Sequence, residues 1–134
     1  MKTILFLCTG NSCRSQMAEG FARKMLPPDF AIYSAGTRAD GMNRFAIRAM
    51  AEAGIDISSQ YSKTLDSLKD IKPDVVITLC DNAKQAYPVY SGKVLREHWG
   101  LEDPADAKGT NEEIMDVYRK TRDEIEKRIR EFLK

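Results

Sequence analysis

The residues best suited to chemistry lie in one short segment near the start of the chain. In order they are Cys8, Thr9, Gly10, Asn11, Ser12, Cys13 and Arg14, followed by Ser15. A loop of this length, with a glycine and small polar residues, can turn its backbone N–H groups inward around an anion, and a guanidinium can bind two oxygens at once. The same positive surroundings stabilise a cysteine thiolate. We therefore expect Cys8 to attack a tetrahedral oxyanion; the alternative is a buried structural cysteine followed by an incidental turn.

The flanking residues predict a strand before this segment and a helix after it. Residues 3–7 are almost purely apolar, as in a strand buried on both faces of a parallel sheet. Residues 15–25 carry apolar side chains at spacings of three and four, and Pro27-Pro28 ends the pattern. Ligands of parallel sheets lie outside the carboxyl ends of the strands, where a following helix points its positive end. The position of the segment thus agrees with its composition.

Further alternation of strands and helices is expected along the chain. The predicted strands are 30–33, which ends in a small-residue turn at 34–37, then 74–79 and 93–99; the predicted helices are 43–53 and a long one after residue 110. Thr110 and Glu113 form a capping box for that last helix. Its expected buried stripe comprises Ile114, Val117, Tyr118, Thr121, Ile125, Ile129, Phe132 and Leu133. We predict an α/β fold, a three-layer sandwich with a four-stranded parallel sheet, in a single domain over residues 1–134.

Composition excludes several classes of function. Of the 134 residues, 21 are Lys or Arg and 20 are Asp or Glu, which leaves no basic surplus for a nucleic-acid backbone. The apolar stretch at the start is too short for a signal peptide, and none is long enough to span a membrane. Three cysteines argue against a secreted disulfide scaffold. We expect a cytoplasmic protein without nucleic-acid or membrane partners, metal or cofactor.

The segment from Cys8 to Ser15 resembles the signature loop of the low-molecular-weight protein tyrosine phosphatases and of the arsenate reductases built on that fold. The turn at 34–37 and Asp103-Pro104 are similar to further family segments, so the resemblance covers most of the chain. It implies a four-stranded parallel sheet with flanking helices. It also implies that Asp103 is the general acid and that Arg14 and residues 9–15 bind arsenate or phosphate. Asn11 and Ser34 would then brace the loop by hydrogen bonds. Judged from its neighbours alone, Asp103 could instead be a turn-forming residue before Pro104.

The two branches of this family differ in residues outside the loop. Ala105-Asp106 follows Asp103-Pro104, where phosphatases usually carry tyrosines, while residues 96–100 and Leu79-Cys80 resemble the arsenate reductases. The resemblance implies that Cys8 forms an adduct with arsenate and that Cys80 then attacks the Cys8 sulfur, expelling arsenite. The polar residues 81–85 are expected to be mobile, which would allow Cys80 to move to Cys8. Alternatively, Cys80 is a small apolar residue at a strand end.

The sequence departs from the usual thioredoxin-linked pattern. Other members carry a third cysteine where this chain has Asn82 or Tyr87, so no relay to a downstream cysteine is expected. A Cys8–Cys80 disulfide would instead be opened by thioredoxin, glutaredoxin or a small thiol. Cys13 and His98 are expected to have packing or hydrogen-bonding roles. The other hypotheses are a phosphatase that hydrolyses aryl phosphates through Cys8 and a non-catalytic oxyanion-binding module.

Overall fold

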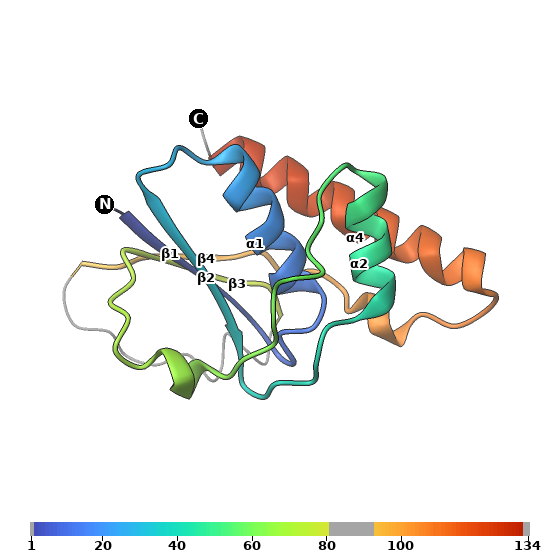
Figure 1. Cartoon of the computed structure of the whole chain (residues 1–134), viewed down its shortest axis with the longest axis horizontal. Coiled ribbons are helices and arrows are strands. Elements are labelled where there is room, and N and C mark those ends of the chain that lie inside the picture. Colours follow the sequence, from blue (N-terminus) through green and yellow to red (C-terminus); the bar gives the residue numbers. More distant parts are fainter. Residues whose placement is uncertain (1, 81–92, 133–134) are drawn as a thin grey trace.

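The sheet of this protein has four parallel strands. The computed structural model describes residues 2–80 and 93–132. The strands are β1 (Lys2–Cys8), β2 (Phe30–Gly36), β3 (Val75–Thr78) and β4 (Leu95–His98), in the order β2-β1-β3-β4 (Figure 1). The predicted α/β class with a four-stranded parallel sheet is confirmed. Residues 81–85, expected to be mobile, and positions 82 and 87 lie outside the described residues.

Within the described residues, three α-helices pack against one another beside the sheet. They are α1 (Arg14–Met25), α2 (Arg44–Glu52) and α4 (Asn111–Phe132), and two short 3-10 helices are η1 (Leu65–Leu68) and η2 (Pro104–Asp106). Helix α1 lies on β1 and β2 and also contacts α2 and α4 (Figure 1). The predicted helices at 15–25 and 43–53 therefore form within a residue or two of the expected ends.

The central strand β1 explains why the first apolar run is uninterrupted. Ile4, Leu5, Phe6 and Leu7 are all at least 97% buried, although successive side chains point to opposite faces. Both faces of the strand are therefore covered, and each of these side chains contributes ~1.5–3 kcal/mol through burial. This packing fixes the end of β1, and with it the position of Cys8.

The prediction of a turn at residues 34–37 is wrong for its first three residues. Strand β2 continues to Gly36, which pairs with Cys8 of β1. A Cβ atom on Gly36 would lie 2.6 Å from the carbonyl oxygen of Thr9 and 2.7 Å from the amide nitrogen of Asn11. The small residues at this place therefore allow the Cys8–Arg14 loop to pack against the strand, rather than serving a turn.

Helix α4 begins with the predicted capping box. The Thr110 amide donates to Glu113 Oε1 at 3.2 Å, and the Glu113 amide donates to Thr110 Oγ1 at 3.1 Å. The predicted buried stripe is partly wrong, because Val117 is 37% exposed and Met115 is buried in its place. The buried residues of the helix are Met115, Tyr118, Ile125 and Ile129. Their spacings of three, seven and four place them on one face of the helix.

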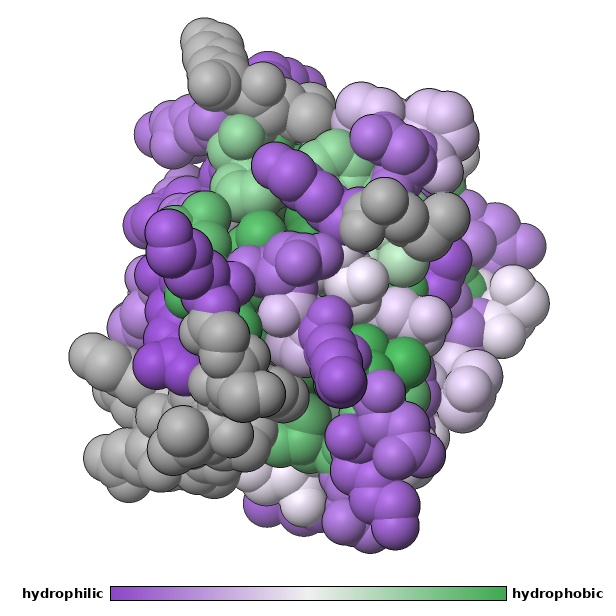
Figure 2. Space-filling model, turned by 90° about the vertical axis from the view of Figure 1, so that its left-hand side faces the viewer, coloured by the Kyte–Doolittle hydropathy of each residue, from purple (hydrophilic) through white to green (hydrophobic). Residues whose placement is uncertain are grey.

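The outer surface carries many polar side chains. Figure 2 shows hydrophilic residues spread over one face, with apolar residues in smaller groups between them. In the described part of the chain, none of the helices combines the length and the apolar character that crossing a membrane requires.

Candidate functional site

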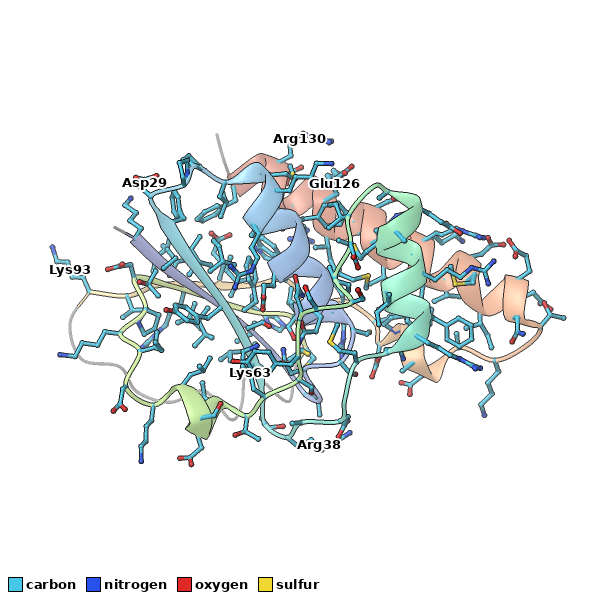
Figure 3. The ribbon with its side chains drawn as sticks, in the orientation of Figure 1. Asp29, Arg38, Lys63, Lys93, Glu126 and Arg130 are labelled. Carbon is cyan, nitrogen blue, oxygen red and sulfur yellow. The ribbon has the colours of Figure 1, made fainter. Side chains whose placement is uncertain are left out.

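The carboxyl ends of β1 and β3 bring predicted site residues to one edge of the sheet. Strand β1 ends at Cys8, and Leu7 pairs with Thr78 at the end of the parallel strand β3. The Leu79 amide then donates to the Leu7 carbonyl at 2.8 Å, which places Cys80 beside the start of the loop. Figure 3 shows Arg38, whose amide bonds to this loop, at the lower edge of the molecule, and Lys93, which precedes β4, at its left edge.

Carbonyl groups of the Cys8–Arg14 loop are bonded to the segments outside it. Thr9 O accepts from the Arg38 amide, Gly10 O from the Asp40 amide and Ser12 O from the Asn43 amide, at 2.9–3.0 Å. With these carbonyls held outward, N–H groups of the loop can turn to its centre and form an anion-binding nest. The chain after β2 therefore acts as an outer support for the loop.

The side chain of Asn11 holds the loop from within. Its backbone has φ +47°, a left-handed conformation that asparagine tolerates better than most residues. Its Nδ2 donates to Ser15 Oγ at 2.7 Å and to Ser34 Oγ at 3.0 Å. Its Oδ1 accepts from the amide of Lys63 and from Gln16 Nε2, both at 2.9 Å. The geometry agrees with the bracing role expected for Asn11 and Ser34.

Cys8 lies at the base of the loop. It is 3% exposed, and its Sγ is 2.8 Å from Ser15 Oγ. Because Ser15 Oγ already accepts a hydrogen from Asn11, its own hydroxyl hydrogen is available for the sulfur. Helix α1 begins at Arg14 and directs its positive end toward the same region. These surroundings suit a negatively charged sulfur.

Cys13 has a different environment from Cys8. Its side chain is buried, and its Sγ lies 4.0 Å from Asp103 Oδ1. Burial, followed by the negative charges of Asp103 and Cys8, raises the pKa of the Cys13 thiol well above its usual range. The thiol therefore stays protonated at neutral pH, which fits the packing role expected for it.

Arg14 joins the loop to two other segments. Its Nη1 donates to the carbonyl of Leu101 at 2.9 Å and of Leu79 at 3.4 Å, and its Nη2 lies 3.4 Å from Asp103 Oδ2. The side chain is almost completely buried, and within residues 2–80 and 93–132 its Nε has no hydrogen-bond partner. A buried N–H donor of this kind is costly unless an acceptor reaches it. The position suits an oxyanion held by the loop.

Asp103 is placed at the same end of the sheet by η2. Its Oδ1 accepts from the amide of Ala105 at 3.0 Å, as the cap of that short helix. Its side chain is about one-third exposed and faces both Arg14 and Cys13. A carboxyl group with access to solvent and to the loop can exchange a proton with a bound oxyanion. The turn role and the proposed acid role are therefore compatible.

Cys80 contacts the side chain of Thr9 in the loop. Its Sγ lies 3.0 Å from Thr9 Oγ1, and Thr9 directly follows Cys8. The residue is 7% exposed and lines a cavity of about 400 Å³ together with Arg14, Gly100, Leu101 and Glu102. The structure thus brings the second predicted thiol next to Thr9, the residue that follows the predicted nucleophile Cys8.

A buried polar network behind the loop was missed from the sequence. Gln16 Nε2 donates to the carbonyl of Tyr61 and to Asn11, while Gln60 Nε2 donates to Gln16 Oε1 at 2.8 Å. Deeper in α1, Glu19 accepts from Ser34 at 2.6 Å and lies 3.7 Å from Lys63 Nζ. Figure 3 shows Lys63 nearer the middle of the molecule than Arg38. The sequence signal that could have predicted this network is the pair Gln16 and Glu19, two polar residues that lie three apart among the buried residues of α1.

His98 has the hydrogen-bonding role expected for it. Its Nδ1 lies 2.7 Å from Thr78 Oγ1 and joins the ends of β3 and β4. In the part of the chain that the structure describes, no cluster of three or more His, Cys, Asp or Glu side chains could hold a metal ion.

Comparison with known proteins gives concordant results. The model of the low molecular weight phosphotyrosine protein phosphatase family matches residues 3–134. An arsenate reductase of Halalkalibacterium halodurans is 53% identical over 131 residues, which cover 98% of this chain and 94% of the relative. A solved arsenate reductase in the phosphate-binding state is 36% identical, with a TM-score of 0.84 over 98% of this chain and 96% of the other. A low molecular weight protein tyrosine phosphatase from T. tengcongensis is 30% identical, with a TM-score of 0.80 over 99% and 98% of the two chains.

Proposed function

We propose that this chain, which belongs to the low molecular weight phosphotyrosine protein phosphatase family, is an arsenate reductase. The observation that carries the proposal is the contact of 3.0 Å between Cys80 Sγ and Thr9 Oγ1, which sets a second thiol beside the Cys8 loop. Hydrolysis of a phosphorylated cysteine does not need a second thiol, whereas reduction of arsenate does. The 53% sequence identity to an arsenate reductase also supports arsenate reduction as the activity of this chain.

In the proposed reaction, arsenate occupies the centre of the loop. The amides of residues 9–15 and the guanidinium of Arg14 stabilise its negative oxygens. The Cys8 thiolate attacks arsenic, an S–As bond forms, and an oxygen leaves as water after Asp103 supplies a proton. Residues 9–15 thus bind the substrate, and only Cys8 is bonded to it.

The Cys80 thiolate then attacks the Cys8 sulfur. An S–S bond forms, the S–As bond breaks, and its electron pair stays on arsenic, which changes from As(V) to As(III) and leaves as arsenite. Two thiols are oxidised for each arsenate reduced. The Cys8–Cys80 disulfide must then be reopened by thioredoxin, glutaredoxin or a small thiol, and the need for reduced thiols favours a cytoplasmic location.

The alternative function is hydrolysis of aryl phosphates through a Cys8 phosphoenzyme. The family and the similarity to the T. tengcongensis phosphatase favour it. The segment after Asp103-Pro104 argues against this function, because Ala105 and Asp106 have no aromatic side chain to pack against the phenyl ring of an aryl phosphate.

One experiment separates the two functions. The reduced protein is incubated with arsenate and a thiol donor, and arsenite is measured for the intact chain, Cys8→Ser and Cys80→Ser. We expect both substitutions to abolish arsenite formation. Hydrolysis of an aryl phosphate is measured in parallel as a control for folding, and we expect Cys80→Ser to keep whatever hydrolysis the intact chain shows. Normal arsenite release by Cys80→Ser would rule out the resolving role.

A further inference from the structure

We propose that the ion pair between Arg38 and Asp40 sets how strongly the Cys8–Arg14 loop binds an oxyanion, and that its effect depends on the charge of that oxyanion. The Asp40 carboxylate repels a bound anion, and the Arg38 guanidinium cancels this repulsion. The inference rests on the proposed function for the position of the oxyanion, and it adds two specificity-determining residues outside the loop.

The backbone of the segment after β2 holds the ion pair beside the loop. The Arg38 amide donates to the carbonyl of Thr9 at 3.0 Å. The Asp40 amide donates to the carbonyl of Gly10 at 2.9 Å. Both charged side chains therefore start from backbone atoms that are bonded to the loop, and their charges are held close to it.

The absence of a side chain at Gly10 leaves room for the Asp40 carboxylate on the loop. A Cβ atom at Gly10 would overlap Asp40 Oδ2 and would lie 2.9 Å from Asp40 Cγ. Because Gly10 is part of the proposed anion nest, we place the carboxylate about 7 Å, or two Cα–Cα steps, from a bound oxyanion. A negative charge at this distance opposes the binding that the loop amides and Arg14 favour.

The guanidinium of Arg38 compensates the charge of this carboxylate. Its Nε lies 2.9 Å from each of the two Asp40 oxygens. The hydrogen bond and the charge of Asp40 raise the pKa of Arg38, and the charge of Asp103 acts in the same direction. The side chains of Arg38 and Asp40 are 66% and 40% exposed, so replacing either one leaves no buried charge unpaired. Substitutions at this pair therefore test its charge rather than the folding of the chain.

The charge of the oxyanion decides the size of the expected effect. At about 7 Å in water, one unit charge on the protein changes the affinity for a monoanion about threefold and that for a dianion about eightfold, because the Coulomb energy doubles with the ligand charge. We expect Arg38→Gln to weaken binding by about these factors and Asp40→Asn to strengthen it by similar ones. The double variant should return toward the intact chain, and Arg38→Lys, which keeps the charge, should stay close to it.

Titration of isotope-labelled protein followed by NMR measures these affinities without turnover. Sulfate serves as a tetrahedral dianion and perchlorate as a tetrahedral monoanion, and the shifts of the loop amides give a Kd for each at one low ionic strength. We expect Arg38→Gln to raise the Kd of sulfate by a factor about three times larger than that for perchlorate. Urea unfolding of every variant verifies that it is folded.

The ion pair between Glu126 and Arg130 on α4 is the matched control. Its two side chains are 3.3 Å apart and are 36% and 60% exposed. Figure 3 shows Glu126 and Arg130 toward the upper edge of the molecule, whereas Arg38 lies at the lower edge. Arg130→Gln changes the net charge as Arg38→Gln does, and we expect it to leave both Kd values unchanged because solvent and salt screen distant charges.

The outcomes separate this proposal from the proposed function. Equal Kd values for Arg38→Gln and Arg130→Gln would overturn the role of the ion pair, and so would a sulfate effect no larger than the perchlorate effect. If sulfate binding responds to Arg38→Gln but arsenite never forms from arsenate, only the proposed function is wrong. If sulfate does not shift the loop amides of the intact chain, both proposals are wrong.

Discussion

Replacement of Asn11 tests how the loop keeps its shape. The side chain is fully buried and makes four hydrogen bonds, with Ser15, Ser34, Gln16 and the Lys63 amide, while the backbone is in the left-handed region. Asn11→Ala removes all four bonds and leaves a Cβ atom in that region. Asn11→Gly removes the same bonds, but glycine adopts the conformation without strain.

The free-energy cost of each substitution follows from which hydrogen-bond donors are left without an acceptor among the described residues. The Lys63 amide is such a donor, at a cost of about 1–3 kcal/mol. Gln16 still donates to Tyr61 O at 2.9 Å, while Ser15 and Ser34 each lose one bond, worth roughly 0.5–1.5 kcal/mol. We expect a loss of about 2–6 kcal/mol in both variants. Because the left-handed strain outweighs the greater backbone entropy of glycine, Asn11→Ala should be less stable than Asn11→Gly by ~0.5–1 kcal/mol.

Urea unfolding followed by the fluorescence of Trp99, the single and buried tryptophan, measures these losses. Phosphate added to the same samples reports on the loop, because a ligand that binds the folded state raises the unfolding midpoint. We expect the intact chain to gain stability from phosphate and both variants to lose most of that gain. Asn111→Ala, at an exposed asparagine, is the control. A loss below about 1 kcal/mol, or equal stability of the Ala and Gly variants, would refute the reasoning.

Two further predictions concern the helices that support the site. Thr110→Ala removes the hydroxyl that accepts from the Glu113 amide, and we expect a loss of about 1 kcal/mol in urea unfolding, with Thr110→Ser restoring most of it. Glu52 has its pKa lowered to about 2, first by its hydrogen bonds from Arg119. Since the folded pKa lies below the ordinary value of 4.5, this stabilisation is present above pH 4.5 and disappears as the pH falls toward 2. The stability difference between the intact chain and Glu52→Gln should shrink over that range, and a difference that does not change with pH would contradict the assignment.

The strand-loop-helix unit at the start of the chain was predictable because local signals agree there. The apolar run predicts a strand, the glycine-containing segment a loop and the helical repeat a helix. Burial of β1 on both faces agrees with the prediction of the strand. Strand β2 was predicted too short, because Ser34 and Gly36 have low strand propensity. Their place in the strand depends on pairing with β1 and on the close approach of Thr9, which only the folded chain reveals.

The polar network behind the loop could not be predicted for a similar reason. Gln16 and Glu19 are charged or polar residues in a helix, and a sequence alone favours placing such residues in solvent. In the structure both are buried, because Asn11, Tyr61 and Ser34 supply hydrogen-bond partners from segments that are distant in sequence. Satisfying buried polar groups is a property of three-dimensional proximity, which no spacing rule encodes.

Thr9 connects the two halves of the proposed reaction. Its carbonyl accepts from the Arg38 amide at 3.0 Å and from Thr37 Oγ1 at 3.2 Å, so its backbone is held by the segment after β2. Its hydroxyl contacts Cys80 Sγ at 3.0 Å. The backbone of the anion loop is therefore fixed by hydrogen bonds, and the Thr9 side chain is left to contact the sulfur of Cys80. Such an arrangement suits a nucleophile that must stay in place while a second thiol leaves its resting contact to attack the Cys8 sulfur.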